Sequence, residues 1–177
     1  LIRRDGQNGG QRVRATTVNG RFDDADITQA ERAMSEMGQS NLFMIRDHDM
    51  ELDHALSLRG YTIKDPVTLY ACPCDLICDI ELPSMSGFAM WPTLSISCDI
   101  WHQGGIGPAR LEVMDRVTGA KTTILARHSG RAAGCAFVAT HENIAMIHAI
   151  EVLAEHRRKG VGRNILVLAA RWAMAIQ

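Results

Sequence analysis

The chain has 177 residues, of which 46% are hydrophobic and 22% are charged, a balance that favours one large globular domain or two small ones. Its 19 Lys and Arg residues nearly cancel its 20 Asp and Glu residues, and only 5% of its residues are aromatic, which argues against a nucleic-acid partner. No run approaches the roughly 18 consecutive apolar residues that a transmembrane helix needs, so we expect no membrane partner.

The first part of the chain alternates expected strands and helices. Polar residues alternating with small or apolar ones predict a strand over 12–18, and apolar residues at helical spacing predict a helix over 26–37. A short apolar strand is expected over 41–45 and a second helix over 50–58. An extended run over 61–72 completes the order strand, helix, strand, helix, strand.

Three cysteines lie at the end of this run and just after it, at positions 72, 74 and 78. A structural zinc site needs a fourth Cys or His at a paired spacing, and only Cys98 and His102 are nearby in the sequence. We therefore expect ordinary thiols and no metal site. The odd total of five cysteines favours a reducing compartment over a disulfide scaffold, so the expected location is cytoplasmic.

A looser stretch separates the two halves of the chain. Frequent Pro, Ser and Gly residues mark 79–104 as a connecting segment with little regular structure. We therefore expect a small α/β subdomain over 1–78, the connection over 79–104, and a second domain over 105–177.

The second half has a clearer pattern. Gly107-Pro108 places a proline in the first turn of a helix expected over 108–117. Strands over 121–128 and 133–140 form an expected hairpin, and a mostly apolar third strand follows over 144–154. A strongly apolar helix begins at Arg163 and continues at least to Met174.

The loop between the third strand and the last helix carries the strongest functional signal. It consists of Arg157-Arg158-Lys159-Gly160-Val161-Gly162-Arg163. Two glycines let the backbone turn sharply and leave its amides open, and the start of a helix favours an anion through its dipole and unpaired N–H groups. Four cationic side chains strengthen this attraction. The loop therefore predicts a phosphate or pyrophosphate site, and no carboxylate cluster is placed to hold Mg²⁺ beside it.

Two common nucleotide-binding motifs do not fit this loop. A P-loop requires G-x-x-x-x-G-K-[ST], which is absent. A dinucleotide-binding G-x-G-x-x-G would need a third glycine where Ile165 stands. A nucleotide-binding module stays a candidate only if the loop holds ATP or NAD in another way.

The stretch from Val152 to Gly162 resembles motif A of the GNAT superfamily, the acyl-CoA-dependent N-acyltransferases. That motif is commonly V-x-P-x-x-[RQ]-x-x-G-x-[GA]. Arg157, Gly160 and Gly162 occupy its three defining positions, whereas Ala154 stands where many members have proline. The motif spans the end of one strand and the start of the following helix, as in this chain.

The resemblance covers about 105–177, with its core over about 144–174, and implies an α/β (α+β) fold, a GNAT-like mixed sheet with flanking helices. Members of the family continue beyond this helix with further strands and a helix, so the C-terminal half of the usual fold is absent from the chain. The chain begins at Leu1 rather than Met and stops at Gln177, so we leave open whether further residues precede and follow this sequence. The first half loosely resembles a degenerate GNAT C-terminal half.

The resemblance implies a function. An N-acetyltransferase of this kind moves acetyl from acetyl-CoA, its co-substrate, to a primary amine of a small molecule or peptide by direct attack. The alternative is a non-catalytic CoA-binding or regulatory domain, and a homodimer is left open. The residues implied in CoA binding are Val152, Ala154, Arg157, Arg158, Lys159, Gly160, Val161, Gly162 and Arg163.

The resemblance also implies that a general base lies on the strand 144–154 or on its neighbour, where His148, Glu151 and Glu142 are the available groups. His148 is the first candidate, because an imidazole titrates near neutral pH, and Glu151 is the second. Under strict alternation His148 and Glu151 point to opposite faces, but a bulge between them would change this. Two alternatives are a His148 that only satisfies a core hydrogen bond and a water chain that takes the proton. Trp91 and Trp101 are expected in the core rather than as ligand-stacking groups.

Overall fold

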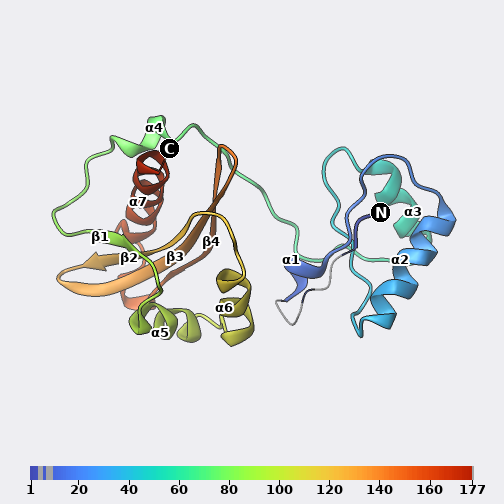
Figure 1. Ribbon diagram of the computed structural model, residues 1–177, viewed down its shortest axis with the longest axis horizontal. Helices are drawn as coiled ribbons and strands as arrows, with labels where there is room; N and C mark the ends of the chain where they lie inside the picture. The colour runs from blue at the N-terminus through green and yellow to red at the C-terminus, as the bar shows by residue number, and fades with distance from the viewer. Residues whose placement is uncertain (4–5, 7–9, 177) are drawn as a thin grey trace. The chain divides into compact units, whose positions relative to one another are not determined.

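The computed structural model describes residues 1–3, 6 and 10–176, and the chain divides into two compact units (Figure 1). Unit 1 comprises Leu1–Leu69 and unit 2 comprises Tyr70–Gln177. The division falls inside the extended run 61–72 and not within 79–104, where the connection was predicted. The reason is that 79–104 contains regular elements that pack within unit 2.

Unit 1 contains the helices α1 (Gln11–Arg14), α2 (Asp24–Glu36) and α3 (Met50–Leu58). The last two confirm the predicted helices. The helix α2 begins earlier than predicted because Asp23 caps it: the Asp26 backbone N–H donates to Asp23 Oδ1 at 2.9 Å, and the Asp23 N–H donates to Asp26 Oδ2 at 3.0 Å.

The predicted strands of unit 1 are wrong. The segment 12–18 begins inside α1, and the pairing around 41–45 is limited to an isolated bridge between Thr16 and Phe43. Ala15, Thr16, Thr17 and Val18 are all buried, whereas a half-buried strand would expose every second residue. This segment therefore passes through the interior of unit 1 and does not lie on a sheet.

The apolar core of unit 1 is small. It contains a cluster of Val18, Ile27, Leu52 and Leu56 with partly buried residues around them, and Ala15, Ala30 and Met34 are also buried. Ile27 comes from α2, while Leu52 and Leu56 come from α3, so the core joins the two long helices of this unit. The run 61–72 has no helix or strand.

Unit 2 is an antiparallel four-stranded sheet with helices on both faces (Figure 1). Its strand order is β1-β2-β3-β4. Its elements are α4 (Asp75–Cys78), β1 (Gly87–Met90), α5 (Ser95–Gln103), α6 (Pro108–Asp115), β2 (Lys121–His128), β3 (Arg131–His141), β4 (Ile144–Val152), the 3-10 helix η1 (Ala154–His156) and α7 (Val161–Ala175). The structure confirms an α/β fold with flanking helices.

Most predicted elements of the second half are confirmed, but the segment 79–104 is not. It holds β1 and α5 where little regular structure was expected, and α4 precedes it. The predicted strand over 144–154 ends at Val152, and the last helix begins at Val161 rather than at Arg163.

The two faces of the sheet bury separate apolar clusters. On one face α7 packs through Val161, Ile165 and Ala169 against sheet residues such as Ile124 and Val138. On the other face, α5 and α6 pack against different residues of the same strands. That second cluster consists of Ile100, Trp101, Met114, Leu125, Cys135 and Phe137. We call these the α7 face and the α5 face.

Candidate active site

The basic loop turns sharply between β4 and α7. Arg158 and Gly160 both adopt left-handed backbone conformations, with φ of 61° and 81°. Gly160 is the N-cap residue of α7, and a side chain there would be strained by the backbone angle. A Cβ built at Gly160 or Gly162 would meet no protein atom within 4 Å. The loop backbone therefore faces open space.

The start of α7 offers unpaired backbone donors. The Asn164 N–H makes the first intrahelical bond, to the Gly160 carbonyl at 3.0 Å. The N–H groups of Val161, Gly162 and Arg163 precede it, no side chain caps the helix, and its first turn has no acidic residue. Three donors and the positive end of the helix dipole thus meet at this point, an arrangement that favours an anion.

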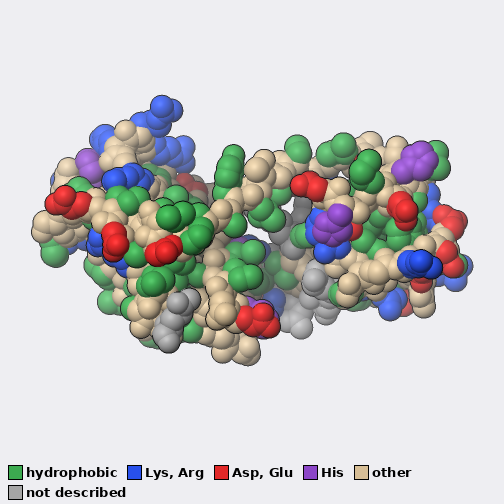
Figure 2. All heavy atoms as spheres, turned by 90° about the horizontal axis from the view of Figure 1, so that it is seen from above, with side chains coloured by type: hydrophobic (Ala, Val, Ile, Leu, Met, Phe, Trp, Pro, Cys, Tyr) green, Lys and Arg blue, Asp and Glu red, His purple; other side chains and the backbone are tan. Residues whose placement is uncertain are grey.

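The cations of the loop fall into two groups. Arg158, Lys159 and Arg163 are exposed, and within the described part of the chain their side chains make no ion pair or hydrogen bond. Figure 2 shows Lys and Arg side chains gathered on one side of unit 2. Arg157 differs, because its Nε donates to the Val152 carbonyl at 2.9 Å and its Nη2 pairs with Glu151 Oε1 at 3.1 Å. Arg157 therefore braces the loop against β4.

A bulge in β4 decides where the two candidate bases point. Phe137 of β3 lies opposite His148, but Cys135 lies opposite Glu151, so β4 contains one extra residue between these pairs. Ala149, at this position, has a left-handed φ of 52°. Because paired residues share a face, the bulge places both His148 and Glu151 on the α5 face.

The Glu151 side chain is enclosed, with 17% of its surface exposed. It lies against Gly104, the residue that ends α5, and a Cβ at Gly104 would collide with its carboxylate. Burial raises the pKa of the Cys135 thiol, and the Glu151 charge adds to the shift. His148 is partly buried on the same face. The α5 face thus carries both a carboxylate and an imidazole, and the carboxylate lies beside Gly104 at the end of α5.

Val152 and Ala154, two of the residues expected to bind CoA, differ in the backbone groups that they leave free for a ligand. The Leu153 N–H donates to the Ala133 carbonyl at 3.0 Å. The backbone N–H and C=O of the neighbouring Val152 therefore point away from β3, to the outer edge of β4. The Val152 carbonyl already accepts a hydrogen bond from Arg157, so the Val152 N–H is the group left for a ligand. Ala154 lies in η1 rather than on the strand, and its carbonyl accepts from the Arg157 N–H.

Over residues 1–3, 6 and 10–176, no group of three His, Cys, Asp or Glu side chains is placed to hold a metal ion. In the same residues, no helix is both long and apolar enough to cross a bilayer.

A sheet with helices on both faces, and a basic glycine-rich turn that leads from an edge strand into an uncapped helix, is the arrangement expected from the resemblance to the GNAT family. A sequence model of the acetyltransferase (GNAT) family matches residues 89–176, which run from β1 into α7. This part of the chain belongs to the GNAT family. No curated protein matches the chain in sequence.

A solved structure has a similar fold. It is described as a GCN5-related N-acetyltransferase from Kribbella flavida, with a TM-score of 0.64 and 18% sequence identity. The similarity covers 86% of this chain and 62% of that one. Because 86% is more than unit 2 alone, residues of both units are included. At this identity the likeness shows the fold alone.

Proposed function

We propose that the protein is an N-acetyltransferase that transfers the acetyl group of acetyl-CoA to a primary amine. The observation that carries the proposal is the start of α7, where three N–H groups and three cations have no partner among the described residues. Cations at a helix N-terminus oppose the helix dipole, so this arrangement destabilises the empty protein and favours a bound anion. The pyrophosphate of acetyl-CoA fits this chemistry and needs no metal.

The reaction would take place along β4 on the α5 face. The amine nitrogen attacks the thioester carbonyl carbon, a C–N bond forms, and the C–S bond breaks as coenzyme A leaves through its sulfur. The proton of the attacking amine passes to a base or to ordered water. His148 is the first candidate for the base. Glu151 is the second, because its carboxylate already pairs with Arg157.

Gly162 offers the most direct test of the phosphate site. Its φ is ordinary and the space around it is open, so Gly162→Leu should fold, since leucine is also a strong helix former. The added side chain would occupy the space where the pyrophosphate approaches. We expect acetyl-CoA to bind at least about tenfold more weakly in a calorimetric titration.

Gly107→Leu is the matched control, because Gly107 also stands at a helix start with an ordinary φ and open space around it. Its affinity for acetyl-CoA should stay near that of the wild type. Unchanged affinity in a folded Gly162→Leu variant would remove the main support for the proposal.

Turnover separates the catalytic proposal from the alternatives. Acetyl-CoA should release free thiol faster in the presence of an accepted amine, tested with a panel of amino acids, polyamines, aminoglycosides and peptides. Binding without amine-dependent thiol release would favour a non-catalytic CoA-binding domain. A thermal shift with ATP or NAD as large as that with acetyl-CoA would favour a nucleotide-binding module.

A further inference from the structure

The carbonyl at the β4 bulge has a specific partner outside the sheet. Trp101 of α5 donates its indole N–H to the Ala149 carbonyl at 2.7 Å. The Trp101 side chain is completely buried in the cluster of the α5 face. The two residues are 48 positions apart in the sequence. The contact therefore joins α5 to β4 at the point where the strand is irregular.

This contact bears directly on whether the bulge forms. A bulge leaves its extra residue outside the ladder of backbone hydrogen bonds. A residue with a side chain is held at a left-handed φ, such as the 52° of Ala149, only where its surroundings favour that conformation. Without the indole N–H, the carbonyl of Ala149 would lose its hydrogen bond next to an apolar cluster. Trp101 thus favours the bulged strand over a regular one.

The bulge in turn determines the position of Glu151. A regular strand would turn this carboxylate to the α7 face, which is lined by apolar residues. The bulged strand places it beside Gly104 and within reach of Arg157, which braces the basic loop. A chain of contacts therefore leads from α5 through β4 to the loop.

We infer that Trp101 is a positioning residue: by holding the Ala149 carbonyl it fixes the β4 bulge, and so keeps Glu151 on the same face as His148. The inference rests on the proposed function for its consequence in catalysis. Its structural part, the hold on the bulge, can be tested without turnover.

Trp101→Phe removes the N–H and keeps an aromatic ring. We expect kcat to fall at least tenfold and the dissociation constant of acetyl-CoA to change less than threefold, because the donors and free cations at the start of α7 are untouched. Trp91→Phe is the matched control. Trp91 packs against the same cluster, but in the described residues its indole N–H has no hydrogen-bond partner, so kcat should stay within twofold of the wild type.

A second substitution distinguishes positioning from lost packing. Glycine adopts a left-handed φ without strain, so Ala149→Gly should restore kcat of the Trp101→Phe variant to within threefold of the wild type. A variant that had lost only packing would not be rescued in this way. If Trp101→Phe does not fold, replacing Trp101 with 3-benzothienylalanine removes the N–H while keeping the ring volume, with the same expected results.

Hydrogen exchange provides a readout besides activity. The Leu153 amide, bonded to the Ala133 carbonyl just beyond the bulge, should exchange at least tenfold faster in Trp101→Phe and unchanged in Trp91→Phe. Faster exchange in Trp101→Phe, together with no turnover in the wild type, would overturn the proposed function but support the structural inference. Unchanged exchange, or a kcat equal to that of Trp91→Phe, would overturn the inference.

Discussion

In unit 2 a four-stranded sheet carries helices on both faces and buries two apolar clusters, whereas the described residues of unit 1 form two long helices, isolated bridges and one small cluster. With so little apolar surface to bury, unit 1 depends more on polar contacts. The difference shows that one chain can combine a domain defined by its sheet with a unit defined by side-chain contacts between helices.

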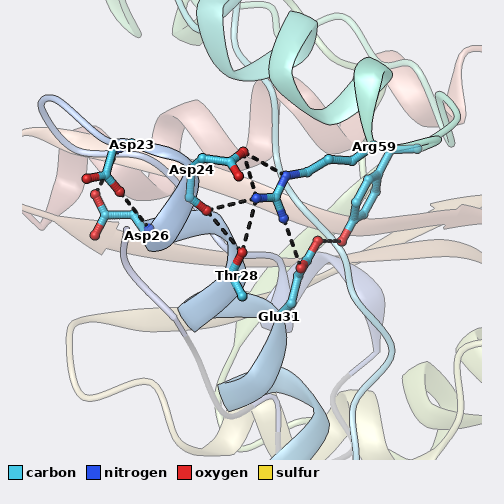
Figure 3. Close-up of polar contacts among 7 residues, drawn as sticks. Asp23, Asp24, Asp26, Thr28, Glu31 and Arg59 are labelled. Carbon is cyan, nitrogen blue, oxygen red and sulfur yellow. Dashed lines mark hydrogen bonds and ion pairs between the residues drawn. The ribbon is translucent and has the colours of Figure 1, made fainter.

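A polar network ties α2 to the segment after α3 (Figure 3). Arg59 donates through Nη1 to Glu31 Oε2 at 3.1 Å, and through Nη2 to the Asp24 carbonyl at 2.8 Å and Thr28 Oγ1 at 3.1 Å. Tyr61 donates its hydroxyl to Glu31 Oε1 at 2.8 Å. These contacts hold together residues about 30 positions apart in the sequence. In unit 2 the pairing of strands has this role.

The largest expected effect concerns the small core of unit 1. Leu52→Ala removes a fully buried side chain from α3 and should destabilise unit 1 by about 2–5 kcal/mol. Hydrogen exchange measured on the whole chain should then rise throughout unit 1 and stay unchanged in unit 2. Leu58→Ala, on the exposed side of the same helix, is the control and should change neither. Equal loss of protection in both units would show that they unfold together.

The next effect concerns the chemistry assigned to unit 2. If His148 is the general base, His148→Ala should lower kcat about 10²-fold and leave the acetyl-CoA dissociation constant unchanged. His54→Ala, an exposed histidine of unit 1, should change neither quantity. Wild-type turnover in His148→Ala would leave Glu151 or ordered water to take the proton.

A pair of glycines separates backbone strain from ligand contact. Gly160 of unit 2 and Gly38 of unit 1 both have left-handed φ and open space around them. A bulky residue at either position should destabilise its unit by about 1 kcal/mol through the strained φ. At Gly160 alone, we also expect acetyl-CoA to bind at least about tenfold more weakly, as measured by titration. If the Gly160 and Gly38 variants bound acetyl-CoA with equal affinity, the loop would not be part of the CoA site.

The smallest effect tests the polar network of unit 1. Burial, together with the hydrogen bond to Glu31, raises the pKa of Tyr61 to about 12. The unfolded chain loses this proton near pH 10, so the stability of unit 1 should fall as pH rises from about 10 to about 12. Tyr61→Phe should lower the stability at neutral pH by about 1 kcal/mol and remove this dependence. Tyr70→Phe, at a position 93% exposed, should retain it, as chemical denaturation at several pH values would show.

The sequence predicted unit 2 better than unit 1 for a physical reason. Its strands and helices have long, regular apolar patterns, so the helix near 108–117, the hairpin and α7 were found close to their observed bounds. In unit 1 the segment 12–18 suggested a half-buried strand, but the residues from Ala15 to Val18 are all buried, which no local pattern indicates. The elements β1 and α5 were missed because Pro and Ser residues around them suggested a loop.

In the candidate site, too, features that are local in the sequence could be predicted, whereas features that depend on the folded chain could not. The basic loop could be found from its two glycines and its cations, because these features are local in the sequence. The direction of the Glu151 side chain could not be predicted, because it depends on a bulge in β4 that Trp101 of α5 contacts. The role of Arg157 as a brace was also missed, since its partners are fixed only by the path of the folded loop.

The central claim, that the loop before α7 holds the pyrophosphate of acetyl-CoA, is tested most directly by two titrations of the whole chain. One uses acetyl-CoA and the other S-acetylpantetheine, which carries the same thioester but no pyrophosphate. We predict that S-acetylpantetheine binds at least about 100-fold more weakly, because it cannot use the charge-assisted hydrogen bonds of the loop. Equal affinities for the two ligands would contradict the account.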